Sequence, residues 1–169
     1  MNMSLLMRSL NRHRVPIKYQ FVRNLAFDNI LDDPRRSEFT MVSEFDEGGF
    51  KINKVYVRHP VILLPKHFLV WNTRSFEDIN VASLDLFSYV YPTLELVLVG
   101  CGEKSSERLP RDVLEYFKYK GIVIEQMDSM NAVQTFNLLI AEGRNVGAAI
   151  LPLVPFPEDE FGQDEDEFN

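Results

Sequence analysis

The segment LELVLVGC, residues Leu94–Cys101, sets the architecture expected for this chain. Five of its eight residues are leucine or valine, and four of them are consecutive, so both faces of an extended strand there are apolar. Strands that are apolar on both faces are typical of sheets covered by a layer on each side. The segment therefore predicts a central strand that is covered on both sides.

Downstream of this strand, helical and extended patterns alternate. One helix is expected to begin near Pro110 and end at Gly121, and a second is expected over Met130–Glu142, capped by Asp128 or Ser129 and stopped by Gly143. Their buried stripes are Val113, Leu114 and Phe117 in the first helix and Val133, Phe136, Leu139 and Ile140 in the second. Two more strands, Ile122–Gln126 and Val146–Leu151, complete a βαβαβ run, whose first crossover is expected to be right-handed.

Upstream, three apolar segments indicate an antiparallel β meander. Phe50–Arg58 alternates apolar and polar residues and predicts one half-buried strand after the Gly48-Gly49 turn. Val61–Leu64 and Phe68–Trp71 are two further short strands, and a short helix is expected over Leu84–Tyr89. The domain is thus predicted to be α/β, with a β meander before the βαβαβ run.

The net charge of -7 over 169 residues is distributed unevenly. Residues 1–27 hold five basic residues and no acid, whereas residues 158–169 hold seven acids and no base. An amphipathic start with arginines and no acids is typical of a mitochondrial transit peptide, and Arg23 predicts cleavage near Leu25/Ala26. We expect a transit peptide over 1–25, a linker over 26–48, a single α/β domain over 49–157 and a disordered acidic tail over 158–169.

The composition argues against several kinds of site. Cys101 is the single cysteine, which excludes a disulfide framework. With only three histidines besides, the sequence shows no pattern of metal ligands. No metal and no cofactor are expected. The body between the charged ends is acidic, which disfavours nucleic-acid binding. The longest apolar stretch, 147–157, contains two prolines and is too short for a transmembrane segment.

Gly100-Cys101-Gly102 is the strongest candidate for chemistry. Glycines at the exit of a buried strand let the backbone approach a phosphate group at a helix start. However, Ser105 stands where a dinucleotide motif has its third glycine, and no spacing pattern places a histidine beside Cys101 as a base. The pattern favours a plain turn with left-handed glycines, and no catalytic residue is predicted.

Polar residues of the second helix are interpreted as making local hydrogen bonds. They also offer side chains to any cleft beyond the strand ends. The residues of that possible partner or ligand cleft are Gly100, Gly102, Asn131, Thr135, Asn137 and Arg144.

An ordered series of motifs between Gly49 and Pro152 resembles the mitochondrial complex I assembly factor 3 family. The motifs are Gly49-Phe50-x-Ile52-Asn53, Leu63-Leu64-Pro65, Trp71-Asn72, Leu94–Gly100-x-Gly102, Glu107-Arg108-Leu109, Asn131-Ala132-x-x-Thr135-Phe136-Asn137-x-Leu139, Glu142-Gly143-Arg144 and Gly147-Ala148-Ala149. One departure is Cys101, where family members often have threonine.

The resemblance implies a three-layer α/β fold with a mixed central sheet. It further implies a non-enzymatic, chaperone-like scaffold that helps to build the early quinone-binding matrix arm of respiratory complex I. The implied partners are complex I assembly factor 4 and early quinone-module subunits, in the mitochondrial matrix and associated with the inner membrane through those partners. The rival interpretation is a small-ligand or enzymatic domain that uses the cleft at Gly100-Cys101-Gly102.

Overall fold

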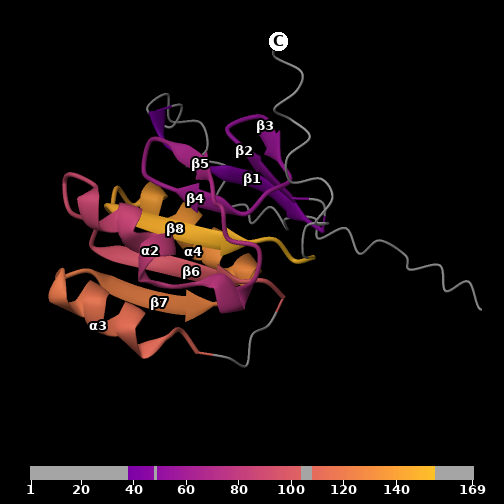
Figure 1. Ribbon diagram of the computed structural model, residues 1–169. Coiled ribbons are helices and arrows are strands. Elements are labelled where there is room, and N and C mark those ends of the chain that lie inside the picture. Colours follow the sequence, from indigo (N-terminus) through magenta and orange to yellow (C-terminus); the bar gives the residue numbers. More distant parts are fainter. Residues whose placement is uncertain (1–37, 48, 104–107, 155–169) are drawn as a thin grey trace, which may run out of the picture.

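The computed structural model describes residues 38–47, 49–103 and 108–154, which include the strands and helices of the expected βαβαβ run (Figure 1). In chain order these are β6 (Leu96–Cys101), α3 (Arg111–Tyr119), β7 (Val123–Met127), α4 (Ser129–Ala141) and β8 (Val146–Leu151). β6 pairs in parallel with both β7 and β8. The expected transit peptide over 1–25 and the expected acidic tail over 158–169 lie outside the described residues.

The central sheet is mixed, as expected from the family resemblance. Its five strands lie in the order β5-β4-β8-β6-β7. β4 (Val61–Leu63) runs antiparallel to β8, and β5 (Phe68–Val70) runs antiparallel to β4. β6 and β8 are buried along their whole length, which explains why their sequences are apolar on both faces.

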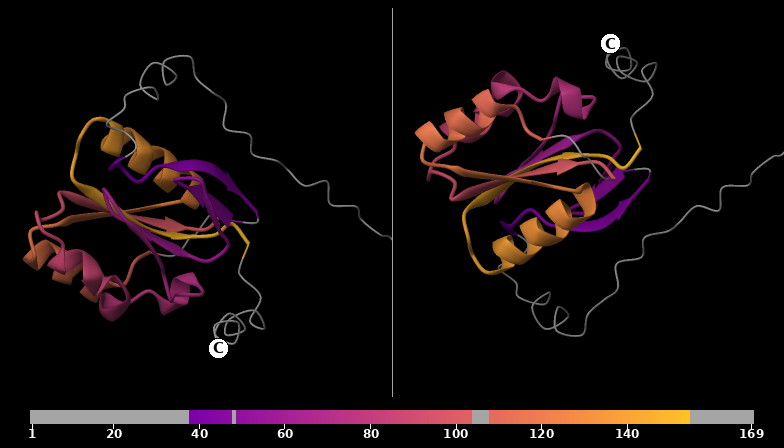
Figure 2. Two further views of the ribbon diagram at one scale, coloured as in Figure 1. Left: turned by 90° about the horizontal axis from the view of Figure 1, so that it is seen from above. Right: turned by 90° about the horizontal axis from the view of Figure 1, so that it is seen from below.

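Two layers cover the central sheet, so the three-layer architecture is confirmed (Figure 2). One face carries α4 together with a small antiparallel sheet, and Phe136 of α4 lies fully buried in that core. The other face carries α2 (Val81–Leu84), the 3-10 helix η3 (Asp85–Tyr89) and α3, with Phe87, Phe117 and Trp71 in a second core. The 3-10 helix η2 (Phe76–Asp78) precedes α2.

The expected single strand over Phe50–Arg58 is wrong. The segment forms a hairpin of β2 (Gly49–Ile52) and β3 (Val55–Val57), turned by Asn53 and Lys54, which have φ values of 45° and 76°. Two positive φ values in a two-residue loop match the twist of a tight hairpin. The alternation of apolar residues continues across this turn, so periodicity alone does not reveal it.

The small sheet has the order β1-β2-β3, and its first strand lies where a linker was expected. β1 (Val42–Asp46) pairs with β2, so the expected linker over 26–48 is corrected at its C-terminal part. The expected meander is therefore divided between two sheets. β1, β2 and β3 form one antiparallel sheet, and β4 and β5 form a hairpin at the edge of the other.

Most of the predicted helix features are confirmed. The Asp128 side chain caps α4, and Gly121 and Gly143 follow α3 and α4 with positive φ. All four predicted residues of the α4 stripe are buried. Leu114 is an exception, because it is exposed on α3 while Val113 and Phe117 are buried. The expected helix over Leu84–Tyr89 is the end of α2 followed by η3.

Candidate functional site

At the carboxyl end of β6, Gly100 and Gly102 have different structural roles. Gly102 has φ +81° and makes the left-handed turn that the sequence predicts. Gly100 lies within the strand, where an added Cβ would stand 2.9 Å from Ile150 Cγ2 and 3.1 Å from Ala132 Cβ. The first distance is shorter than real Cβ contacts, and the second is tighter than nine in ten of them. Gly100 therefore permits α4 to pack closely on the sheet, and the expectation that both glycines are left-handed is wrong for Gly100.

The buried side chain of Ser129 ties this end of the sheet together. The Gly102 N–H donates to Ser129 Oγ at 2.8 Å, and the Ser129 hydroxyl donates to the Leu151 carbonyl at 2.6 Å. The Ser129 N–H donates in turn to the Gly102 carbonyl at 2.8 Å. These bonds connect the end of β6, the start of α4 and the end of β8, and they use polar groups that a ligand at the turn would need.

The N-terminus of α4 is occupied by its own cap. The carboxylate of Asp128 accepts the Asn131 N–H at 2.9 Å and the Asn131 side-chain amide at 2.6 Å. A carboxylate there complements the positive end of the helix dipole, as a bound anion would. Asn131 thus lies beside the Gly102 turn, and its backbone and side-chain amides both donate to the capping Asp128 carboxylate.

Cys101 is buried in β6, and its thiol lies 3.6 Å from the Val99 carbonyl. Burial raises the pKa of the Cys101 thiol to about 12, so the thiol stays protonated at neutral pH. Only the thiolate is a strong nucleophile. The geometry therefore gives Cys101 a packing role in the strand. Within the described part of the chain, no three His, Cys, Asp or Glu side chains are grouped to hold a metal ion.

Asn137 anchors α4 to the small sheet. Its Oδ1 accepts the Val42 N–H at 3.0 Å, and its Nδ2 donates to the Val42 carbonyl at 2.7 Å. The amide side chain thus bonds β1 much as a neighbouring strand does. The expectation of a local hydrogen bond is wrong for Asn137, because its partner lies 95 positions away in the sequence.

The six residues of the predicted cleft do not come together. Gly100, Gly102 and Asn131 lie near the carboxyl end of β6, whereas Arg144 follows the far end of α4, a helix about 20 Å long. There Arg144 pairs with Glu95, with an Nη2–Oε2 distance of 3.0 Å. Thr135 is half-buried midway along the helix, and Asn137 faces β1. These six residues therefore do not form one cleft.

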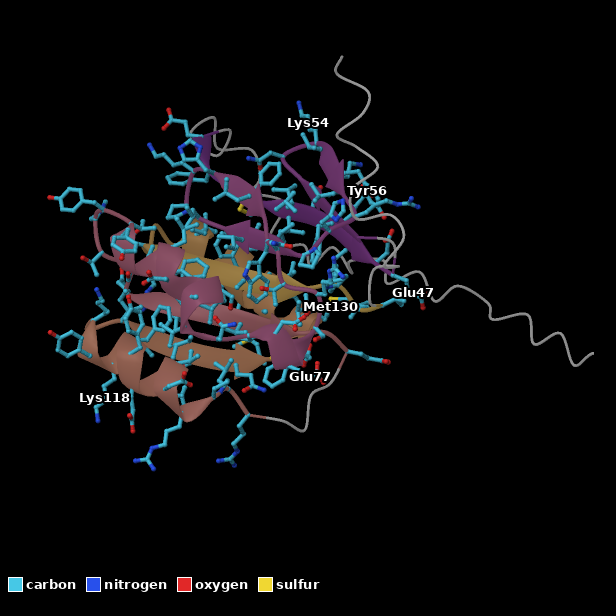
Figure 3. All side chains as sticks on the ribbon, in the orientation of Figure 1. Glu47, Lys54, Tyr56, Glu77, Lys118 and Met130 are labelled. Carbon is cyan, nitrogen blue, oxygen red and sulfur yellow. The ribbon has the colours of Figure 1, made fainter. Side chains whose placement is uncertain are left out.

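The opposite end of the sheet, where β6, β7 and β8 begin, has a different surface. Tyr89, Tyr91 and Tyr119 are 72%, 94% and 87% exposed. The ammonium group of Lys120 lies 5.8 Å from the ring centre of Tyr89 and 5.3 Å from that of Tyr116, which joins η3 to the end of α3. We call the surface made by Tyr89, Tyr91, Lys118, Tyr119 and Lys120 the tyrosine end. In Figure 3, Lys118 of α3 and Met130, in the first turn of α4, lie far apart, toward opposite ends of the molecule.

Hydrogen bonds hold the backbone beneath the tyrosine end. The Tyr116 hydroxyl donates to the Asp85 carboxylate, and this bond lowers the pKa of Asp85. Tyr116 also bonds the Ser88 hydroxyl at 3.1 Å. The Asn145 amide donates to the carbonyls of Pro92 and Thr93 at 2.8 and 2.9 Å, which fixes the segment after Tyr91.

Comparison with known proteins gives the family. The model of a family described as a protein of unknown function (DUF498/DUF598) matches residues 42–151. A relative from Xenopus tropicalis named NADH dehydrogenase [ubiquinone] 1 alpha subcomplex assembly factor 3 is 38% identical over 123 residues, which are 73% of this chain and 67% of the relative. The chain belongs to the complex I assembly factor 3 family.

The Homo sapiens member of the assembly factor 3 family is 40% identical over 111 residues, which are 66% of this chain and 60% of that protein. The chain thus spans 60 to 67% of the length of these two relatives. A Mth938-like domain from Bordetella pertussis, solved by NMR, superposes with a TM-score of 0.65 at 24% identity, covering 75% of this chain and 94% of the domain. That likeness concerns the fold alone.

The tyrosine end of this assembly factor 3 family member is not predicted from the sequence. Four of the six tyrosines fall between Tyr89 and Tyr119, in two short segments separated by β6. This clustering is visible in the sequence. Its meaning is not, because only the fold shows that the two segments meet and that three of the rings face solvent.

Proposed function

We propose that this chain is an assembly factor of mitochondrial respiratory complex I and works without catalysing a reaction. The observation that carries the proposal is the identity of 38 to 40% to relatives named as complex I assembly factors. The family match covers the described domain from β1 to β8.

The more specific proposal is a chaperone-like scaffold for the early quinone-binding matrix arm of complex I. Complex I assembly factor 4 and early quinone-module subunits are the proposed partners. The proposed location is the matrix, with attachment to the inner membrane through those partners. The acid-free, arginine-bearing leader over 1–25 supports import, and among the described helices none is long and apolar enough to cross a membrane.

A scaffold role is better supported than a ligand or enzymatic role at Gly100-Cys101-Gly102. At that turn, Ser129 bonds both Gly102 and Leu151, and the Cys101 thiol is protonated at neutral pH. The tyrosine end instead exposes large side chains, of the kind that protein interfaces favour.

The test is deletion of the gene followed by rescue with the full chain, with assembled complex I measured on native gels. We expect complex I to be lost on deletion and restored by the full chain. A chain that lacks residues 1–25 is the matched control and should restore nothing, because it is not imported. Normal complex I in the deletion cells would contradict the proposed function.

A further inference from the structure

We propose that the tyrosine end is the docking surface through which this protein holds its complex I client, and that the client presents an acidic protein surface with apolar side chains. The inference rests on the proposed function, because it names the surface that performs it. Three observations carry it: the exposure of the aromatic rings, the charge beside them and the bonds that hold them in place.

The first observation is the exposed ring area. Tyr91 and Tyr119 are almost fully exposed, and Tyr89 is nearly as open. Val123, the first residue of the edge strand β7, is also more than half exposed. Tyrosine is enriched among the residues that contribute most to protein–protein binding, since its ring covers a large area and has few rotatable bonds.

The second observation is the local charge. The chain is acidic overall, with a net charge of -7, yet the last turn and cap of α3 bring Lys118 and Lys120 to the tyrosine end. The carboxylate of Asp85 already accepts the Tyr116 hydroxyl, and this bond, helped by Lys120, lowers the pKa of Asp85. Lys120 lies over the rings of Tyr89 and Tyr116, so cation and aromatic surface form one patch. Acidic groups on a partner complement this patch.

The third observation is preorganisation. Hydrogen bonds from Tyr116 and Asn145 fix the segments on which Tyr89, Tyr91 and Tyr119 stand. Surfaces that are ordered before binding lose less conformational entropy on association. By contrast, anionic membranes are recognised by clusters of about four to eight basic residues, more than the two lysines here. The partner class that fits is therefore a protein.

Site-specific photo-cross-linking in mitochondria tests this proposal. A photoreactive phenylalanine analogue replaces Tyr91 in the full chain, and in a matched control it replaces Tyr56, a half-exposed tyrosine on β3 (Figure 3). We expect adducts with identified complex I subunits from position 91 and none from position 56. Combined Lys118→Glu and Lys120→Glu exchanges should lower the adduct yield about tenfold or more.

Other adducts would overturn the docking surface. Adducts from position 91 with only a second copy of the chain, or equal yields from both positions, contradict it. So does binding of the purified chain to vesicles of phosphatidylcholine and cardiolipin that depends on the three tyrosines, because the occupant is then a membrane.

The rescue assay separates failure of this inference from failure of the proposed function. A variant with Tyr89→Ser, Tyr91→Ser and Tyr119→Ser, present at wild-type abundance, should fail to restore complex I. Full restoration by that variant overturns the docking surface and leaves the assembly function standing. Complex I that is normal without the chain refutes the function, and the inference falls with it.

Discussion

The two ends of the central sheet differ in how their polar and aromatic groups are used. At the carboxyl end, Gly102, Ser129 and Leu151 bond one another and are buried. At the amino end, Tyr91 and Tyr119 project into solvent above a backbone that is already fixed. The first end therefore stabilises the fold, and the second leaves side chains available for another molecule.

This arrangement reverses a familiar rule. Open α/β sheets usually bind ligands beyond the carboxyl ends of their strands, where loops to opposite faces separate. In this domain, the end of α4 nearest that position is closed by the Ser129 bonds and the Asp128 cap. The proposed docking surface lies at the other end of the sheet.

The largest effect should come from the core beneath α4. Phe136→Ala removes a fully buried ring and should lower the free energy of unfolding by about 3 to 5 kcal/mol. Leu138→Ala on the exposed face of the same helix is the control and should change it by less than about 0.5 kcal/mol. Urea unfolding measures both. Equal effects would mean that the assigned buried face of α4 is wrong.

A smaller loss is expected at the carboxyl end. Ser129→Ala leaves the Gly102 N–H and the Leu151 carbonyl without the hydroxyl that joins them, at a cost of about 1 to 3 kcal/mol. The exposed Ser43 hydroxyl also bonds a carbonyl, that of Lys51, so Ser43→Ala is the matched control and should be nearly neutral. Thermal unfolding compares them, and a neutral Ser129→Ala would remove the structural role assigned to this end.

The pH dependence of stability should show the burial of Cys101. Because its pKa is raised from 9.0 to about 12, the folded state keeps a proton that the unfolded state releases. Stability from this source is present below about pH 9 and declines as the pH rises toward 12, by at most about 1.4 kcal/mol per pH unit. Urea unfolding at about pH 8 and about pH 10.5 should therefore show a steeper decline for the wild type than for Cys101→Ala. Identical declines would contradict the burial argument.

The smallest change in stability is expected at the tyrosine end. Tyr91→Ser should alter the free energy of unfolding by less than about 0.5 kcal/mol, since the ring is 94% exposed. Tyr116→Phe, beneath the same surface, removes the bonds to Asp85 and Ser88 and should cost about 1 kcal/mol. Calorimetry distinguishes these outcomes. A large loss in Tyr91→Ser would show that this end also supports the fold.

The sequence predicts the parallel part of the fold well, because buried strands and amphipathic helices leave strong local patterns. Phe136 and the Asp128 cap are confirmed for that reason. The Asn53-Lys54 hairpin was missed, since backbone dihedrals at a turn do not alter the alternation of apolar residues. β1 was likewise missed, because a linker was expected there. β1 is bonded to Asn137, which lies 95 positions away in the sequence, so no local pattern indicates this contact.

The candidate site was harder to predict than the fold. Glycines after a strand look alike in sequence whether they cradle a phosphate or, like Gly100, let a helix approach. Exposed tyrosines likewise give no periodic signal, and their grouping depends on how η3 and α3 pack. Tertiary contacts determine both features, so sequence patterns alone could not assign them.

The most direct test of the contrast between the two ends is complex I content per molecule of folded protein, measured in rescued deletion cells for Ser129→Ala and for Tyr91→Ser combined with Tyr119→Ser. We expect Ser129→Ala to lower abundance but to keep wild-type complex I per folded molecule. The tyrosine variant should keep its abundance and lose complex I per molecule, even when it is overexpressed. The reverse pattern, normal assembly with the tyrosine variant and a loss per molecule with Ser129→Ala, would contradict the account.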